Sequence, residues 1–376
     1  MVIELQSTDD ARDVVHRAVQ ALAEGKLVGF PTETVYTIAA STMQPAACER
    51  LSALKGGLAA LSAQPGELAL GVKGIGEALD YIPEMSALGK RLARRCWPGP
   101  VTLVFDSGHR ESLIRRLSPR VQNVVAPGAQ LGLRAPAHPL LQEVLKLLVG
   151  PVLLTSANRP GETEPQTAQE VVRTLTDEVA LILDDGPCRF GQPASVVRIE
   201  NCQYAVVRPG VVSEQNLKRL ASQILVFVCT GNTCRSPMAE LLCRKLLAEK
   251  FGCPLDKLED HGIIILSAGI AAMMGGRPTQ EAVDVMRDDF ALDLSGHTSQ
   301  PLTEQMIRQA DHLFVMTHSH QQAILSEFPE AADRTRLLSR DERDVSDPIG
   351  GPLELYRRCA EQIEAALRSW VAELTT

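Results

Sequence analysis

The hydrophobic positions of the chain fall into short apolar runs that are separated by longer amphipathic stretches. In the first 212 residues, four runs have the length of buried strands: 26–30 (KLVGF), 101–105 (VTLVF), 151–155 (PVLLT) and 180–185 (ALILDD). Helix-like stretches lie between them. Strands that alternate with helices are typical of α/β or α+β domains. We therefore predict one domain of this class over residues 1–212.

A second series of elements begins at residue 224. Helical patterns alternate with four apolar strands: 224–230 (ILVFVCT), 263–269 (IIILSAG), 312–317 (HLFVMT) and 336–339 (RLLS). Strands separated by helices of this length predict a parallel, doubly wound α/β sheet. The polar, helix-prone residues 213–223 are predicted to link this second domain, 224–376, to the first.

Length and composition agree with two globular domains. The chain has 376 residues, 45% of them hydrophobic and 22% charged, which is enough for two separate cores. A net charge of −8 argues against a protein whose main role is to coat nucleic acid. The N-terminus shows neither a signal peptide nor a membrane span, so we expect a cytoplasmic location and no membrane association.

The segment CTGNTCRSP at 229–237 lies between the first strand and the first helix of the second domain. A loop there points backbone N–H groups at one spot, and the helix N-terminus adds positive potential, so the loop stabilises a phosphate and favours a thiolate at Cys229. Arg235 can hold two phosphoryl oxygens in a bidentate contact, and Ser236 can donate to the thiolate. A bare Cys-x5-Arg match is weak, because a buried cysteine and a surface arginine also produce it, but the strand–loop–helix context favours a cysteine-dependent phosphatase. The predicted phosphate-binding residues are Thr230, Gly231, Asn232, Thr233, Cys234 and Ser236.

With SPMAE at 236–240, SAG at 267–269 and DPIGG at 347–351, this loop resembles the low-molecular-weight protein tyrosine phosphatase family. The resemblance covers residues 224–373. It implies that Cys229 is the nucleophile, that Arg235 binds the phosphoryl group and that Asp347 is the general acid. Without the family, Asp347 could equally be a capping or solvated residue. The family's reaction forms a phosphocysteine that water hydrolyses, and it requires no cofactor.

Two positions bear on the substrate of this domain. Tyrosine phosphatases of the family usually have an aliphatic residue before the second cysteine and aromatic residues after Asp-Pro, whereas this chain has Thr233 and Ile349. A hydroxyl suits a guanidinium better than a phenyl ring, because an unpaired buried N–H costs about 1–3 kcal/mol. The string CTGNTCRSPMAE is similar to the protein-arginine phosphatase branch, which implies phosphoarginine on proteins as substrate. Phosphotyrosine is the competing substrate, and Ile349 departs from the aromatic residue that the arginine branch often has.

The other cysteines and the histidines do not predict a metal site. Cys234 lies five residues from Cys229 and either forms a protective disulfide with it or packs as a small residue. The nine cysteines lack paired zinc spacing, so neither a disulfide framework nor a metal site is expected. The histidines at 297, 312, 318 and 320 also lack a metal spacing, and we interpret them as solvated or capping residues.

The first domain carries a series of ordered motifs: FPTETVY (30–36), Lys55, WPGPVTLVF (97–105), LRAPAHP (133–139), TSAN (155–158), ASVV (194–197) and VRPG (207–210). Over residues 5–212 they resemble the YrdC/Sua5 family, whose fold is a twisted mixed sheet with helices. That family makes threonylcarbamoyl-adenylate from threonine, bicarbonate and ATP with Mg, for modification of adenosine 37 in tRNA. The resemblance implies threonine contacts by Thr34, Arg134 and Ser195, and contacts to the nucleotide and its phosphates by Lys55, Ser156, Asn158 and Arg208.

The first domain also departs from that family. Gly57 stands where the family has an arginine two residues after its lysine, and Thr37 replaces the glycine after Tyr36. Losing a charge-assisted contact to phosphate weakens binding by about 10- to 100-fold. Three alternatives follow for this domain: a weak synthetase, a retired one that binds only nucleotide or RNA, or a module that delivers the phosphatase to a partner. A further alternative makes the synthase the main activity and the phosphatase accessory.

Overall fold

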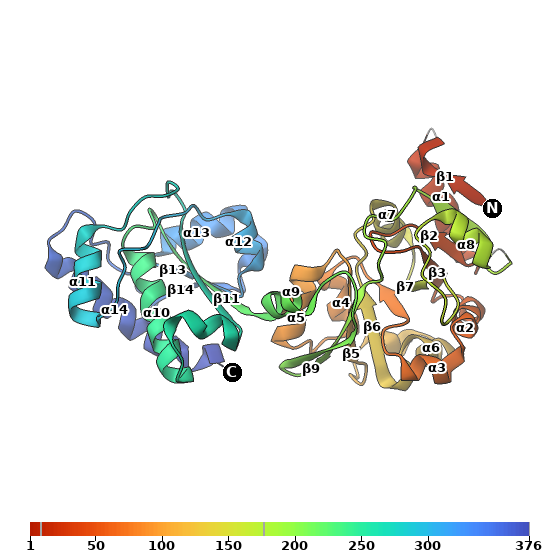
Figure 1. Cartoon of the computed structure of the whole chain (residues 1–376), viewed down its shortest axis with the longest axis horizontal. Coiled ribbons are helices and arrows are strands. Elements are labelled where there is room, and N and C mark those ends of the chain that lie inside the picture. The colour runs from red at the N-terminus through yellow and green to blue at the C-terminus, as the bar shows by residue number, and fades with distance from the viewer. Residues whose placement is uncertain (8–9, 176, 376) are drawn as a thin grey trace. The chain divides into compact units, whose positions relative to one another are not determined.

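The computed structural model describes residues 1–7, 10–175 and 177–375. Contacts between Cα atoms divide the chain into two compact units, Met1–Leu220 and Ala221–Thr376 (Figure 1). The stretch expected to link the domains, 213–223, contains α9 (Glu214–Ala221) and the first residue of the next strand. No helix in the described ranges is both long and apolar enough to cross a membrane.

In the described part of unit 1, ten strands form one mixed sheet in the order β1-β8-β2-β3-β7-β4-β6-β5-β9-β10. Their bounds are β1 (Val2–Glu4), β2 (Val28–Phe30), β3 (Thr37–Ser41), β4 (Ala69–Gly71), β5 (Val101–Asp106), β6 (Gln130–Arg134), β7 (Val152–Ser156), β8 (Leu181–Asp184), β9 (Ser195–Glu200) and β10 (Gln203–Arg208). Every residue of the central strand β3 is buried, whereas the edge strand β10 alternates between exposed and half-buried residues. This difference is the one expected between a strand covered on both faces and a strand at the border of a sheet.

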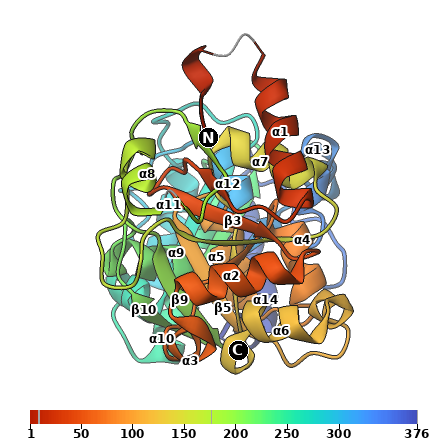
Figure 2. The ribbon, with the colours of Figure 1, turned by 90° about the vertical axis from the view of Figure 1, so that its right-hand side faces the viewer.

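The sheet of unit 1 is covered by helices, as the sequence predicts. The helices are α1 (Ala11–Ala23), α2 (Pro45–Leu54), α3 (Gly57–Ala63), α4 (Ile75–Tyr81), α5 (Ala87–Cys96), α6 (Pro119–Val125), α7 (Pro139–Leu147) and α8 (Ala168–Leu175), with short 3-10 turns at Leu5–Ser7, Leu113–Arg116 and Pro127–Ala129. Apolar faces of α1 and α7 pack together with β2 and β7 in one buried cluster. The two helices lie side by side in Figure 2. The predicted mixed sheet with helices is confirmed.

In the described part of unit 2, four parallel strands form a second sheet in the order β12-β11-β13-β14. The strands are β11 (Gln223–Cys229), β12 (Ile263–Gly269), β13 (His312–Val315) and β14 (Thr335–Leu337). The helices are α10 (Arg235–Phe251), α11 (Gln280–Phe290), α12 (Glu304–Gln309), α13 (His318–Glu327) and α14 (Leu353–Val371), with 3-10 turns at Leu255–His261, Pro329–Ala331 and Glu373–Thr375. The predicted four-stranded, doubly wound fold is confirmed.

The central strand β11 shows why helices cover both faces of this sheet. Leu225, Phe227 and Cys229 face a core shared with α10, α11 and α14, whereas Ile224 and Val226 face a second core shared with α12 and α13. Successive side chains of a strand point to opposite faces, so a run of apolar residues buries both. Because all four strands are parallel, their carboxyl ends meet at one edge of the sheet, where ligands bind in such folds.

Candidate functional site

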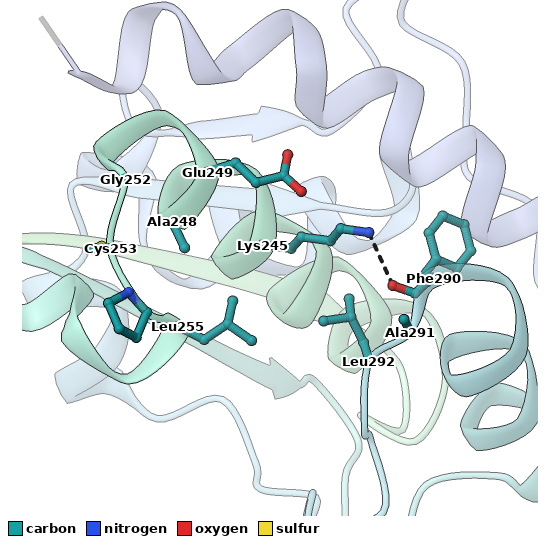
Figure 3. A pocket seen from close by; sticks show the side chains of 10 residues that line it. Lys245, Ala248, Glu249, Gly252, Cys253, Leu255, Phe290, Ala291 and Leu292 are labelled. Carbon is teal, nitrogen blue, oxygen red and sulfur yellow. Dashed lines mark hydrogen bonds between the residues drawn. The ribbon is translucent and has the colours of Figure 1, made fainter.

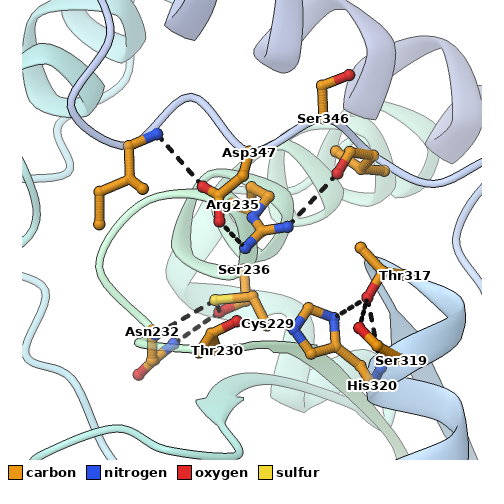
Figure 4. A network of polar contacts seen from close by, with 12 residues as sticks. Cys229, Thr230, Asn232, Arg235, Ser236, Thr317, Ser319, His320, Ser346 and Asp347 are labelled. Carbon is orange, nitrogen blue, oxygen red and sulfur yellow. Dashed lines mark hydrogen bonds and ion pairs between the residues drawn. The ribbon is translucent and has the colours of Figure 1, made fainter.

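The predicted phosphate loop connects the end of β11 to the start of α10. Cys229 is the last residue of the strand and Arg235 is the first residue of the helix. Cys229 is buried and lies in register with Gly269 at the end of β12. Figure 4 shows Cys229, Arg235 and Asp347 gathered around this loop. The structure therefore brings together the three residues for which the sequence predicts catalytic roles.

A backbone N–H and a hydroxyl lie within hydrogen-bond distance of the sulfur of Cys229. The Asn232 backbone N–H donates to Sγ at 3.2 Å, and Ser236 Oγ lies 3.0 Å from Sγ. The Asn232 side-chain amide donates to Ser236 Oγ at 2.9 Å, which leaves the single Ser236 proton for Sγ or for the Ala268 carbonyl oxygen, 3.3 Å away. Hydrogen bonds of this kind, at the N-terminus of a helix, stabilise negative charge on the sulfur.

Asn232 holds the loop in its conformation. Its backbone has a positive φ of 54°, a region that asparagine tolerates better than most residues. Its side-chain amide donates to Ser267 Oγ at 2.9 Å, and its side-chain oxygen accepts the Gln300 N–H at 2.9 Å. The predicted SAG motif contributes here through Ser267 and Gly269. A Cβ on Gly269 would lie 2.5 Å from the Thr230 carbonyl oxygen, so only glycine lets β12 approach the loop this closely.

Arg235 and Asp347 form an ion pair at the mouth of the loop. The Arg235 NH2 group donates to Asp347 Oδ2, and the NH1 group lies 3.5 Å from the Val345 carbonyl oxygen. The Arg235 side chain is 5% exposed, whereas that of Asp347 is 41% exposed. A buried cation that faces an open carboxylate can turn to phosphoryl oxygens, while the carboxylate stays accessible to a leaving group.

The other loop residues have different surroundings. Thr233 accepts the Thr279 N–H at 3.0 Å through its carbonyl, and none of the described residues hydrogen-bonds its hydroxyl, which is half-buried. Burial raises the pKa of Cys234 to about 11. Cys229 and Cys234 are both free thiols, so the disulfide between them stays a prediction. Thr230 and Gly231 complete the loop.

In unit 1, the predicted nucleotide residues gather around the buried Lys55. Its Nζ donates to Asn158 Oδ1 at 2.8 Å and to Ser156 Oγ at 3.1 Å. The same ammonium lies 2.9 Å from Glu67 Oε1, and Arg208 NH1 lies 2.9 Å from Glu67 Oε2. Burial lowers the pKa of Lys55, and Glu67 opposes that effect. Glu67 belongs to none of the motifs of the first domain, so no pattern in the sequence indicated its role.

The predicted threonine residues divide into two places. Arg134 NH2 donates to Thr34 Oγ1 and to Glu33 Oε1, each at 2.8 Å. Ser195 instead exchanges two hydrogen bonds with the main chain of Val212, both 3.0 Å long. The Ser195 hydroxyl is thus engaged by the chain itself.

Predicted site residues line a cavity in unit 1, but they do not line the larger cavity described for unit 2. A cavity of about 30 Å³ lies among Glu67, Arg134, Ser156 and Arg208. A larger one in unit 2, of about 580 Å³, is lined by the C-terminal part of α10 and by residues 290–292 (Figure 3). It lies roughly 20 Å along α10 from the phosphate loop, at 1.5 Å per residue, and none of the predicted site residues lines it. We assign no function to it.

Comparison with known proteins identifies both units. Residues 20–210 match the Sua5/YciO/YrdC family, described as "Telomere recombination", and residues 224–376 match the low molecular weight phosphotyrosine protein phosphatase family. The protein-arginine-phosphatase of Bacillus subtilis (strain 168) is 37% identical over 155 residues, which are 40% of this chain and 95% of that protein. The chain belongs to both families. Its Sua5 unit is thus joined in sequence to a phosphatase unit that is homologous to protein-arginine and protein-tyrosine phosphatases.

The Sua5 unit also has relatives among known proteins. The threonylcarbamoyl-AMP synthase of Pyrococcus abyssi (strain GE5 / Orsay) is 28% identical over 208 residues, which cover 54% of this chain and only 56% of that protein. The solved structure of a P. abyssi Sua5 variant is 20% identical, with a TM-score of 0.50, and covers 71% of this chain and 91% of that structure. This likeness supports the fold of the Sua5 unit.

Two histidines contact the phosphatase loop. These contacts were not predicted from the sequence. His320 is buried, with Nε2 2.9 Å from Thr230 Oγ1 and Nδ1 2.9 Å from Thr317 Oγ1 (Figure 4). His297 Nε2 lies 2.9 Å from the Asn232 carbonyl oxygen. The interpretation of these side chains as solvated or capping residues is wrong for His320, because Thr317 caps α13 and the imidazole turns inward. His318 is exposed and pairs with Asp344, as expected for a solvated residue.

Burial and the nearby Arg235 guanidinium lower the pKa of His320 to about 4, from an ordinary value of 6.5. Between these two values the unfolded chain binds more protons than the folded chain, so the stability of the phosphatase unit falls as the pH drops through this window. We expect His320 to account for a loss of about 2–3 kcal/mol between pH 7 and pH 4.5. Urea unfolding followed by Trp370 fluorescence, in a Trp97→Phe background, measures it.

The His320→Asn variant should lose that part of the pH dependence. His318→Asn is the matched control, because it removes an exposed imidazole of the same helix that pairs with Asp344 instead of Thr230. An equal pH slope in the His320→Asn variant and its parent would contradict this assignment.

Proposed function

We propose that the phosphatase unit removes phosphoryl groups from phosphoarginine in proteins, through a phosphocysteine intermediate at Cys229. The observation that carries the proposal is the convergence of the Cys229 sulfur, the Arg235 guanidinium and the Asp347 carboxylate on one helix N-terminus. A thiolate nucleophile, a bidentate phosphoryl ligand and a proton donor are the groups that a covalent phosphoryl transfer needs.

In the first displacement, Arg235 exchanges its contact with Asp347 for two oxygens of the substrate phosphoryl group. Once Arg235 has released it, the Asp347 carboxylate takes up a proton from solvent. The Cys229 thiolate attacks phosphorus, the phosphorus–nitrogen bond breaks, and Asp347 gives this proton to the departing guanidine nitrogen. The backbone N–H groups of the loop and the start of α10 stabilise the charge on the equatorial oxygens. The exposure of Asp347 leaves room for the arginine side chain of the substrate.

In the second displacement, Asp347 takes a proton from water as the water oxygen attacks phosphorus. The phosphorus–sulfur bond breaks, inorganic phosphate forms, and the Cys229 sulfur returns to its thiolate. The Asn232 N–H and the Ser236 hydroxyl, which lie beside the sulfur, stabilise the thiolate as a leaving group. The phosphoryl group is therefore transferred first to the Cys229 sulfur and then to water, and residues of this chain provide every catalytic group.

The preference for phosphoarginine is supported by Thr233 and by the arginine-phosphatase relative. The hydroxyl of Thr233 has no partner among the described residues and sits on the loop that surrounds the phosphoryl group. It is available to accept a guanidinium N–H, whereas a phenyl ring offers it no partner. Ile349, 62% exposed beside Asp347, supplies no aromatic wall for a phenyl ring.

The Thr233→Ile variant is expected to lower kcat/KM for phosphoarginine relative to phosphotyrosine by about tenfold. The reason is that a guanidinium N–H loses its acceptor, a change of about 1–3 kcal/mol. The measurement is a pair of kinetic assays on peptides of identical sequence that carry either phosphoarginine or phosphotyrosine.

Thr233→Ser is the matched control, since it keeps the hydroxyl and should keep the ratio. A wild-type preference for phosphotyrosine, together with an unchanged ratio in Thr233→Ile, would reject the phosphoarginine assignment and favour the competing phosphotyrosine substrate. The phosphatase chemistry at Cys229 would stand in either case.

We assign no synthase activity to the Sua5 unit. ATP, threonine and bicarbonate are the ligands that the synthase reaction requires, and the surroundings of Lys55 and Arg208 do not fit the phosphates of ATP.

A further inference from the structure

A single carboxylate joins the two cations that the family resemblance assigns to the phosphates of ATP. Glu67 Oε1 lies 2.9 Å from Lys55 Nζ, and Oε2 lies 2.9 Å from Arg208 NH1. The side chains of Lys55 and Glu67 are 2% and 16% exposed, so both charges are largely withdrawn from water. Each oxygen of the carboxylate thus contacts one cation, in the way that two oxygens of a phosphate group could.

The position of Glu67 is fixed by the fold of the Sua5 unit. The residue lies two positions before the start of β4 and follows Gly66, which has a positive φ of 81°. Its backbone N–H donates to the Gln64 carbonyl at 3.2 Å, and β4 pairs with β6 and β7 within the sheet. The carboxylate is therefore carried by a hydrogen-bonded turn that leads directly into the sheet.

Three observations show that the site as built does not fit a nucleotide triphosphate. Glu67 places negative charge where the phosphates need positive charge, and glycine at position 57 leaves the site without a third cation. The cavity beside Glu67 and Arg208 measures about 30 Å³. Pockets that bind small molecules typically measure about 300–1,000 Å³. A triphosphate could enter only by displacing a carboxylate that is tethered to the same chain and thus present at a high effective concentration.

We propose that Glu67 is an internal substitute for a ligand phosphate, which keeps Lys55 and Arg208 paired and prevents the Sua5 unit of this chain from binding ATP. The carboxylate also supplies the anion that a buried ammonium requires, so the unit folds without a nucleotide. Glu67 thereby determines ligand specificity: it rejects polyphosphates. The proposal is independent of the function proposed for the phosphatase unit.

The test is isothermal titration of the full chain with Mg-ATP and, separately, with inorganic tripolyphosphate. We expect the wild type to bind both probes with a Kd of about 1 mM or weaker, and Glu67→Gln to bind them at least about tenfold more tightly. Any binding at the phosphatase loop is common to both proteins, so the difference between them reports the Sua5 unit. The double variant Lys55→Met/Glu67→Gln should lose the gain.

Glu164→Gln is the matched control, because Glu164 also acts on the charge of Lys55 but forms no ion pair with Arg208. It should bind Mg-ATP as the wild type does. Equal affinity in the wild type and a folded Glu67→Gln variant would overturn the proposal. If Glu67→Gln fails to fold, the wild type and Lys55→Met are compared instead. Wild-type binding of Mg-ATP with a Kd of about 10 µM, and loss of this binding in Lys55→Met, would also overturn the proposal.

Discussion

The Cys229→Ser variant is expected to keep its fold and to lose phosphatase turnover by on the order of 10⁴-fold or more. Serine has nearly the shape of cysteine, and its hydroxyl can keep the hydrogen bonds to Asn232 and Ser236. An alcohol is a far weaker nucleophile than a thiolate at neutral pH, so the covalent step is almost abolished. Removal of a covalent nucleophile elsewhere reduces kcat by about 10⁶-fold. Steady-state hydrolysis of para-nitrophenyl phosphate measures the loss.

Cys253→Ser is the matched control for this experiment, because it makes the same exchange at a partly buried thiol of the phosphatase unit. It should retain wild-type turnover. A folded Cys229→Ser protein that still hydrolyses the substrate at a wild-type rate would show that another group is the nucleophile.

The Asp347→Asn variant is expected to slow hydrolysis of phosphoarginine and phenyl phosphate by about 10²- to 10⁴-fold, the usual contribution of a general acid. The loss should be much smaller for para-nitrophenyl phosphate, whose leaving group departs without a proton. The amide that replaces the carboxyl group cannot donate the proton, yet it preserves the size of the side chain beside Arg235. The measurement compares kcat across aryl phosphates with leaving groups of graded basicity.

Asp344→Asn provides the control, since Asp344 lies on the same segment and pairs with the exposed His318 instead of Arg235. It should change kcat little for every substrate. If Asp347→Asn reduced the rates of good and poor leaving groups equally, Asp347 would be acting on phosphate binding through Arg235 and not as a proton donor.

The phosphate loop could be predicted from the sequence because its parts are contiguous. An apolar strand, a turn-forming pair and a helix start lie within a few residues of Cys229, and the loop geometry follows from that order. Asp347 is different, because it lies 112 residues after Arg235 and no local pattern connects the two. Only the family resemblance indicated it, and the structure places the two side chains in contact.

His320 and Glu67 could not be predicted, for the same physical reason. Each acts through partners that are distant in sequence: His320 with Thr230, and Glu67 with Arg208. In the sequence, His320 looks like an ordinary residue in the first turn of a helix, and Glu67, which follows Gly66, looks like a solvated turn residue. Only the packing of the sheet shows that one side chain turns into the loop and the other lies between two cations.

The Arg235–Asp347 pair has a consequence for the free enzyme. A phosphoryl group must separate these two charges before it can be held by Arg235, so part of the binding free energy offsets the loss of their contact. The exposure of Asp347 keeps that offset modest, because water screens a half-exposed ion pair. The pair thus positions both groups without closing the site to phosphate.

Detection of the phosphocysteine intermediate decides whether Cys229 is the nucleophile. With para-nitrophenyl phosphate the first step should be fast, so hydrolysis of the intermediate limits turnover and the intermediate accumulates. The wild-type chain is mixed with this substrate, quenched in acid during turnover and digested, and the peptides are examined by mass spectrometry. We expect a pre-steady-state burst of nitrophenol and a single phosphoryl group on Cys229. An active enzyme that shows no burst, and whose phosphoryl group is absent from Cys229 or sits on another residue such as Cys234, would contradict this expectation.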